Sequence, residues 1–151
     1  KPLCLYCPMQ QHCKAHAQGL ETELPFKKAK KPVPIRYAKV LLIESDGQWL
    51  WQQRPNSGLW GGLWSLPIIE NDIEFDQICQ SLKLISKTES MQISHSFTHF
   101  TWILTAQIFK VEAEEKEYLL SELDGEWLSP QKATQMGIPT AMKKLISAVD
   151  L

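Results

Sequence analysis

The sequence predicts an α+β domain in which a sheet lies between helices. Strand-like apolar stretches and segments with helical apolar spacing follow one another from residue 37 to the end of the chain. The 151 residues, 44% of them hydrophobic and 22% charged, have the composition of one globular domain with its own core. The same composition excludes collagen-like, low-complexity and disordered chains.

Two strands joined by a tight turn are predicted at the start of this domain. Residues 37–44 (YAKVLLIE) and 48–54 (QWLWQQR) are rich in apolar and aromatic side chains, and the Asp-Gly pair between them favours a hairpin. A loop with three glycines, residues 55–62, and a short apolar segment, residues 63–67, follow.

A helix is predicted over residues 72–85, because Phe75, Ile78, Cys79 and Leu82 recur at the spacing of one helical face. Cys79 is therefore expected to be a small core side chain.

The rest of the domain is predicted to contain three strands and two helices. Ser129 and Pro130 suit the start of the first of these helices and Gly137 its end, while Met142, Leu145, Ile146 and Val149 share one face of the second. In order, the expected elements are strands over 89–94 and 100–111, an acidic loop over 112–117, a strand over 125–128, a short helix after 129 and a helix over 141–149.

A basic leader precedes an acidic body. Residues 1–39 carry eight Lys and Arg against two acids, a sum of +6, while residues 40–151 carry eight against fifteen, a sum of −7. Within the leader, residues 24–36 (LPFKKAKKPVPIR) hold three prolines, so an extended linker is predicted there, with the domain beginning near Tyr37. Charge alone is consistent with a nucleic-acid-contacting arm or with a solvated tether. The lysines in question are Lys27, Lys28, Lys30 and Lys31.

Three of the four cysteines lie close together, with the spacing C-x2-C-x5-C at Cys4, Cys7 and Cys13. The chain has neither an apolar run of about 20 residues nor the apolar stretch of a signal peptide, so we expect a soluble protein that is not secreted. Tightly spaced thiols in such a chain indicate metal ligands more than disulfides. The spacing alone allows an iron–sulfur cluster, or zinc with His16 as a fourth ligand.

Four features together resemble the C-terminal domain of MutY-type adenine DNA glycosylases and the end of the preceding iron–sulfur loop. The cysteines match the last three ligands of that family's C-x6-C-x2-C-x5-C loop, whose first ligand would then lie seven residues before Cys4. The chain is thus expected to begin inside the motif. The other matching stretches are QRPNSGLWGGLW (53–64), HSFTHF (95–100) and MGIPTAM (136–142).

The resemblance implies a domain with the Nudix fold of the MutT hydrolases, a mixed sheet between helices. It implies three parts: the end of the iron–sulfur loop (1–20), a basic interdomain linker (21–36) and the Nudix-like domain (37–151). The expected function is recognition of 8-oxoguanine opposite adenine, within an enzyme that hydrolyses the N-glycosidic bond of the mispaired adenine in base excision repair. The catalytic domain would lie outside this chain, which is itself expected to be non-catalytic.

The resemblance also implies the cofactor and partners. A 4Fe-4S cluster is expected in the full-length protein, on Cys4, Cys7 and Cys13, whereas three thiolates alone are not expected to hold it in this chain. The expected partners are double-stranded DNA with 8-oxoguanine opposite adenine and the catalytic domain of the same protein. The protein is expected to be a monomer in the bacterial cytoplasm, at the nucleoid, with no membrane association.

The family's Phe-Ser-His run, which meets the oxidised base, corresponds to Phe97, Thr98 and His99. In 8-oxoguanine N7 becomes a hydrogen-bond donor, so a hydroxyl can accept from it, whereas N7 of guanine is an acceptor. Threonine keeps the hydroxyl but adds a methyl group that restricts χ1. Read without the family, His95 and His99 are expected to be structural, with a cross-strand pair or a metal pair as the alternatives.

Two other functions are compatible with parts of the sequence. A Nudix hydrolase would need clustered carboxylates for a divalent ion. Here Glu70, Asp72, Glu74 and Asp76 are expected to precede the corresponding helix, and residues 77–86 contain none. The six tryptophans would suit a protein-docking surface if they were exposed. In the glycine-rich loop, Trp60 and Trp64 could stack on a base or pack on the core.

Overall fold

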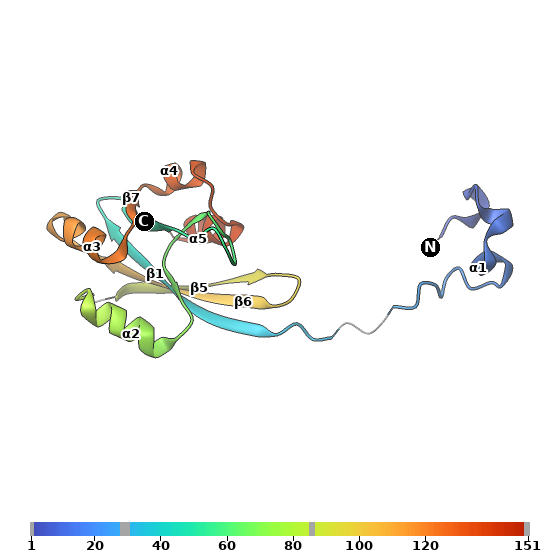
Figure 1. Cartoon of the computed structure of the whole chain (residues 1–151), viewed down its shortest axis with the longest axis horizontal. Coiled ribbons are helices and arrows are strands. Elements are labelled where there is room, and N and C mark those ends of the chain that lie inside the picture. The colour runs from blue at the N-terminus through green and yellow to red at the C-terminus, as the bar shows by residue number, and fades with distance from the viewer. Residues whose placement is uncertain (1, 28–30, 85–86, 150–151) are drawn as a thin grey trace. The chain divides into compact units, whose positions relative to one another are not determined.

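The centre of the sheet consists of two antiparallel hairpins, and one long strand of each hairpin pairs in parallel with a long strand of the other (Figure 1). The computed structural model describes residues 2–27, 31–84 and 87–149. It divides into two compact units, Lys1–Pro32 and Val33–Leu151. No helix in the described ranges is long and apolar enough to cross a membrane.

The first unit consists of short helical turns. They are η1 (Cys4–Tyr6), η2 (Gln10–His12) and α1 (Lys14–Ala17). Backbone hydrogen bonds from Cys7 N to Cys4 O, from Gln10 N to Cys7 O and from Cys13 N to Gln10 O, each of 3.1–3.2 Å, link the three cysteines through successive turns. The described cysteines are all free thiols.

The described residues of the second unit form seven strands, four α-helices and one 3-10 helix. The β1–β2 turn has φ of 53° at Asp46 and 71° at Gly47, which confirms the predicted Asp-Gly hairpin. In chain order the elements are β1 (Ile35–Ser45), β2 (Gln48–Gln53), β3 (Trp64–Ser65), β4 (Ile68–Ile69), α2 (Asp72–Ser81), β5 (Lys87–Ser96), β6 (Thr101–Lys110), η3 (Ala113–Glu115), α3 (Lys116–Leu123), β7 (Glu126–Leu128), α4 (Pro130–Gln135) and α5 (Thr140–Ala148).

The sheet is mixed, with the strand order β3-β2-β1-β6-β5, while β4 pairs with β1 and β7 with β2. Strands β1 and β6 run parallel, with Ile35 opposite Thr101 and Glu44 opposite Lys110. Strand β5 returns antiparallel to β6 and forms one edge. The predicted α+β class with a mixed sheet between helices is confirmed.

Strand β1 is buried on both faces, which explains its continuous apolar sequence. Val40 and Leu42 belong to one core cluster, with Met142 and Leu145 of α5. Leu41 and Ile43 point the other way, into a second cluster with side chains of α2 and α3. Helices therefore cover both faces of the sheet (Figure 1).

Three sequence predictions need correction. The predicted helix over 72–85 ends at Ser81, where Lys83 adopts a left-handed conformation. Asp72, Glu74 and Asp76 do not precede α2 but lie within its first turns, because Asn71 caps the helix through Ile73 N and Glu74 N. Helix α3, with its buried Leu119, was not predicted after the acidic loop.

Burial of the tryptophans removes the argument for a docking surface built on them. Trp49, Trp51 and Trp102 are at most 3% exposed. The other three, Trp60, Trp64 and Trp127, are half-buried and pack against the two core clusters.

Candidate nucleic-acid interface

The residues expected to meet DNA lie at the tip of the β5–β6 hairpin. Residues 97–100 connect Ser96 to Thr101, and a 2.8 Å hydrogen bond from Phe97 N to Phe100 O closes the turn. Thr98 and His99 between them are both exposed. The hairpin thus presents a hydroxyl and an imidazole together to solvent.

Strand periodicity explains why Thr98 faces outward. Along β5 and into the turn, Met91, Ile93, His95 and Phe97 are half-buried, and the residues between them are exposed. Successive side chains of a strand point to opposite faces, so the residue after Phe97 is directed away from the core.

Phe97 is an anchor rather than part of the exposed tip. Its ring lies 4.6 Å from that of His95, 4.7 Å from that of Phe100 and 5.8 Å from that of Trp60, measured between centroids. Trp102 completes this group, 5.4 Å from Trp60 and 6.1 Å from Phe100. We call these five residues the aromatic cluster. Each such pair contributes about 0.5–1.5 kcal/mol beyond its buried area.

The glycine-rich loop supports the cluster by placing Trp60 in it. Trp60 itself has a left-handed backbone, with φ of 57°, and Gly62 follows with φ of 74°. A Cβ at Gly61 would come within 2.6 Å of Asn56 O, so the loop requires glycine there. A 2.9 Å bond from Arg54 Nε to Leu59 O holds the loop from inside. Of the two roles considered for Trp60 and Trp64, packing on the core fits this arrangement.

The sequence did not indicate that His95, Trp60 and Trp102 support the tip. The signal available was the alternation along β5, which places His95 on the same face as Phe97. Desolvation by burial, followed by the positive charge of Lys144, lowers the pKa of His95 below its ordinary value of 6.5. His95 and His99 point to different environments, one into the cluster and one to solvent.

A second candidate site lies in the first unit. Ligand atoms of Cys4, His16 and Glu21 all lie within 4.8 Å of one another. His16 Nδ1 is 3.2 Å from Glu21 Oε1. Among the residues that the structure describes, this is the one group of three or more His, Cys, Asp or Glu side chains with such spacing.

Neighbouring groups change the pKa of the Cys4 thiol. Desolvation, and then the negative charges of Glu21, Cys13 and Cys7, raise its pKa above the ordinary value. A bound metal cation would reverse this effect by favouring the thiolate. The group that the structure brings together offers one sulfur, one nitrogen and one oxygen donor, a mixture that zinc accepts, and Cys7 and Cys13 are not part of it.

The predicted phosphate-contacting lysines are described in part. Lys27 and Lys31 are exposed. Lys28 and Lys30 lie outside the described residues.

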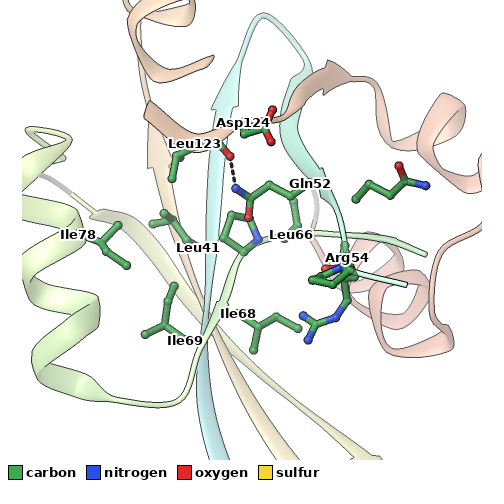
Figure 2. Close-up of a pocket in the computed structure, with 13 residues that line it drawn as sticks. Leu41, Gln52, Arg54, Leu66, Ile68, Ile69, Ile78, Leu123 and Asp124 are labelled. Carbon is green, nitrogen blue, oxygen red and sulfur yellow. Dashed lines mark hydrogen bonds between the residues drawn. The ribbon is translucent and has the colours of Figure 1, made fainter. Parts of the chain in front are cut away.

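A pocket of about 360 Å³ lies beside α2 (Figure 2). Its apolar wall includes Leu41, Leu66 and Ile78, and Gln52 donates a hydrogen bond to Leu123 O at its edge. Asp124 is the one carboxylate among its described lining residues. The other lining residues are Gln53, Arg54, Pro55, Ser65, Pro67, Ile68, Ile69 and Leu123.

In a comparison with known protein families, residues 38–148 match the NUDIX domain. Two adenine DNA glycosylases, from Rattus norvegicus and Mus musculus, align with 96% of the chain at 26% and 22% identity. The chain spans 38% of the length of each of these relatives.

Solved structures of low sequence identity share the fold. Shewanella oneidensis NrtR complexed with a 27mer DNA has a TM-score of 0.53 at 15% identity, over 74% of this chain and 57% of that one. MutT of the Nudix hydrolase family from methicillin-resistant Staphylococcus aureus has a TM-score of 0.51 at 16% identity, over 78% of this chain and 100% of that one.

Proposed function

Because the chain belongs to the NUDIX domain family, we propose that it uses this fold as the 8-oxoguanine-recognising module of an adenine DNA glycosylase. The observation that carries the proposal is the exposed pair Thr98 and His99, held at a hairpin tip on the aromatic cluster. Relatives that align with nearly the whole chain are adenine DNA glycosylases, which supports the same assignment.

The chemistry of the tip suits this lesion. The Thr98 hydroxyl accepts a hydrogen bond from N7–H of 8-oxoguanine, whereas N7 of guanine has no hydrogen to donate. A single contact of this kind discriminates by about 1–3 kcal/mol. His99, beside it on the turn, can donate to a phosphate or base edge. Phe97 positions both through its packing.

The rest of the protein follows from the same proposal. The full-length protein hydrolyses the N-glycosidic bond of adenine opposite 8-oxoguanine, with a catalytic domain outside the present sequence, and acts as a monomer on double-stranded DNA in the bacterial cytoplasm. Lys27 and Lys31, with Lys28 and Lys30, contact phosphates from the linker without reading sequence.

A 4Fe-4S cluster on Cys4, Cys7 and Cys13 is part of the proposal for the full-length protein. The helical turns that join these cysteines, and the electrostatic effect of Cys13 and Cys7 on Cys4, support a shared sulfur-rich site. When bound, the cluster would cross-link the turns of a unit that has no buried residue of its own among those described. Zinc is the competing occupant of this unit, with Cys4, His16 and Glu21 as its ligands.

The same geometry supports nucleotide hydrolysis less well than it supports recognition of 8-oxoguanine. Asp72 is engaged by Lys39, with Nζ 3.1 Å from Oδ1, and α2 contributes Ile78 rather than a carboxylate to the pocket. A divalent ion requires several converging oxygen ligands.

The proposal is tested with the full-length protein and a truncated protein that lacks residues 33–151. We expect the full-length protein to bind a duplex with 8-oxoguanine opposite adenine more tightly than one with guanine opposite adenine, at one fixed salt concentration. The truncated protein should lose most of this preference. Equal preference in the two proteins would contradict the proposed function.

A further inference from the structure

Acidic side chains are absent from the strand ends that meet at the hairpin tip and from the last two helices. Within the second unit, residues 33–43, 90–111 and 127–149 contain no Asp or Glu. The acids of the second unit fall elsewhere, in residues 44–46, 70–76, 89, 112–126 and 150.

The sheet register brings two of these segments, residues 33–43 and 90–111, together. The start of β1 pairs with the start of β6, at Ile35 and Thr101, and the end of β5 lies beside them. Glu44 and Asp46 lie at the opposite end of β1, in and beside its turn to β2. The hairpin tip and the strand ends beside it therefore carry no acid, and the acids next along β1 lie at the start of α2, where Asp72 pairs with Lys39.

Arg36 lies on one flank of the tip. Its guanidinium carbon is 4.6 Å from the centroid of Phe100, and the residue is exposed. In the sheet Arg36 is opposite Trp102, which is opposite His95 on β5. Cross-strand partners share a face, so Arg36 is at one end of a row that crosses the aromatic cluster.

Lys144 lies beyond the other end of this row. It projects from α5, and its Nζ is 3.3 Å from Ser94 O on the edge strand β5. Adjacent strands are about 4.8 Å apart, so β1 and β5 are separated by roughly 10 Å across β6. In the described part of the chain neither Arg36 nor Lys144 has a carboxylate within 4.0 Å.

We propose that Arg36 and Lys144 contact DNA phosphates on either side of the base that the hairpin tip reads. This inference rests on the proposed function and adds the residues that seat the tip on the duplex. Two cations without acidic partners, one held by an aromatic ring and one by a backbone carbonyl, suit a polyanion with regularly spaced charges. Contacts of this kind fix the position and orientation of the protein on the duplex but do not distinguish one DNA sequence from another.

The test measures equilibrium binding of the full-length protein across a range of salt concentrations, with the lesion duplex and the undamaged mispair. Arg36→Ala and Lys144→Ala should each weaken binding to both duplexes by the same factor, on the order of tenfold near 0.1 M salt. Each should also reduce the slope of log affinity against log salt by about 1. Arg36→Lys keeps the charge and should keep the slope.

Lys110→Ala is the matched control, because Lys110 is an exposed cation at the far end of β6. It removes the same charge and should change neither affinity nor slope. Thermal unfolding of each variant identifies any loss that comes from misfolding, and in that case Arg36→Gln and Lys144→Gln, which keep a polar side chain, replace the alanine variants.

An unchanged salt slope in folded variants at Arg36 and Lys144 would overturn the inference. So would a loss confined to the lesion duplex, since that result would mean that these residues act on base reading. A wild-type protein that binds both duplexes equally would instead contradict the proposed function, and the salt slopes would still decide the phosphate contacts.

Discussion

The rings of Phe97 and Phe100 stack across the base of the β5–β6 turn, with centroids 4.7 Å apart and planes inclined by 29°. The same two residues share the backbone hydrogen bond that closes the turn. Both ends of the segment that carries Thr98 and His99 are therefore held. A rigid tip loses less conformational freedom when it binds, which favours affinity.

Phe97→Ala should lower the free energy of unfolding by about 2 kcal/mol, because it removes a half-buried ring and its four aromatic contacts. Urea denaturation measures this change. Ile73→Ala is the control: Ile73 is 70% exposed on α2, and its loss should cost less than about 0.5 kcal/mol. Equal effects of the two substitutions would mean that Phe97 does not anchor the tip.

His95 should make folding stability depend on pH just below 6.5. Burial lowers its pKa in the folded protein, so the unfolded chain binds the proton more tightly. Stability attributable to His95 is complete above the unfolded value of 6.5 and is lost as the pH falls from there through the lowered folded value. His95→Gln should flatten this part of the profile.

An NMR titration of the His95 imidazole checks the cause directly. Lys144→Gln removes the positive charge that, after burial, also lowers the pKa of His95, so it should move this pKa back toward 6.5. Lys132→Gln should leave the pKa of His95 unchanged. A native imidazole that titrates at or above 6.5 would show that the ring is not buried as the structure has it.

Cys4→Ser should remove iron from the full-length protein, together with its visible absorbance, because a cluster corner loses its thiolate. Cys79→Ser is the matched control, since Cys79 packs beside the core cluster of α2 and α3. Metal analysis and absorbance spectra report both. Zinc in place of iron, lost on His16→Ala as well, would support the Cys4, His16 and Glu21 site instead.

Local sequence signals predicted most of the sheet and its helices, because those signals act over a few residues. The Asp-Gly pair determined the β1–β2 turn, and Ser129 caps α4 as expected, accepting from Lys132 N. Helix α3 was missed because its start lies in an acidic run, where the Glu112–Glu115 capping box resembles a polar loop.

Contacts between distant segments could not be predicted from the sequence. Arg36 and Phe100 meet because β1 and β6 pair in parallel, a pairing that no nearby residue signals. Trp60 reaches Phe97 through a left-handed backbone that a tryptophan rarely adopts. The exposed tip could be identified from the motif, whereas the side chains that support it could not.

Substitution of Thr98 tests the central claim most directly, with the ratio of affinities for lesion and undamaged duplexes as the measured quantity. The ratio at one fixed salt concentration cancels contacts to phosphates. In the full-length protein, Thr98→Val keeps the shape and removes the acceptor, which should reduce this ratio by the equivalent of about 1–3 kcal/mol. Thr98→Ser should equal or exceed the native ratio. An unchanged ratio in folded Thr98→Val protein would contradict the account, because the lesion would then be read by another group.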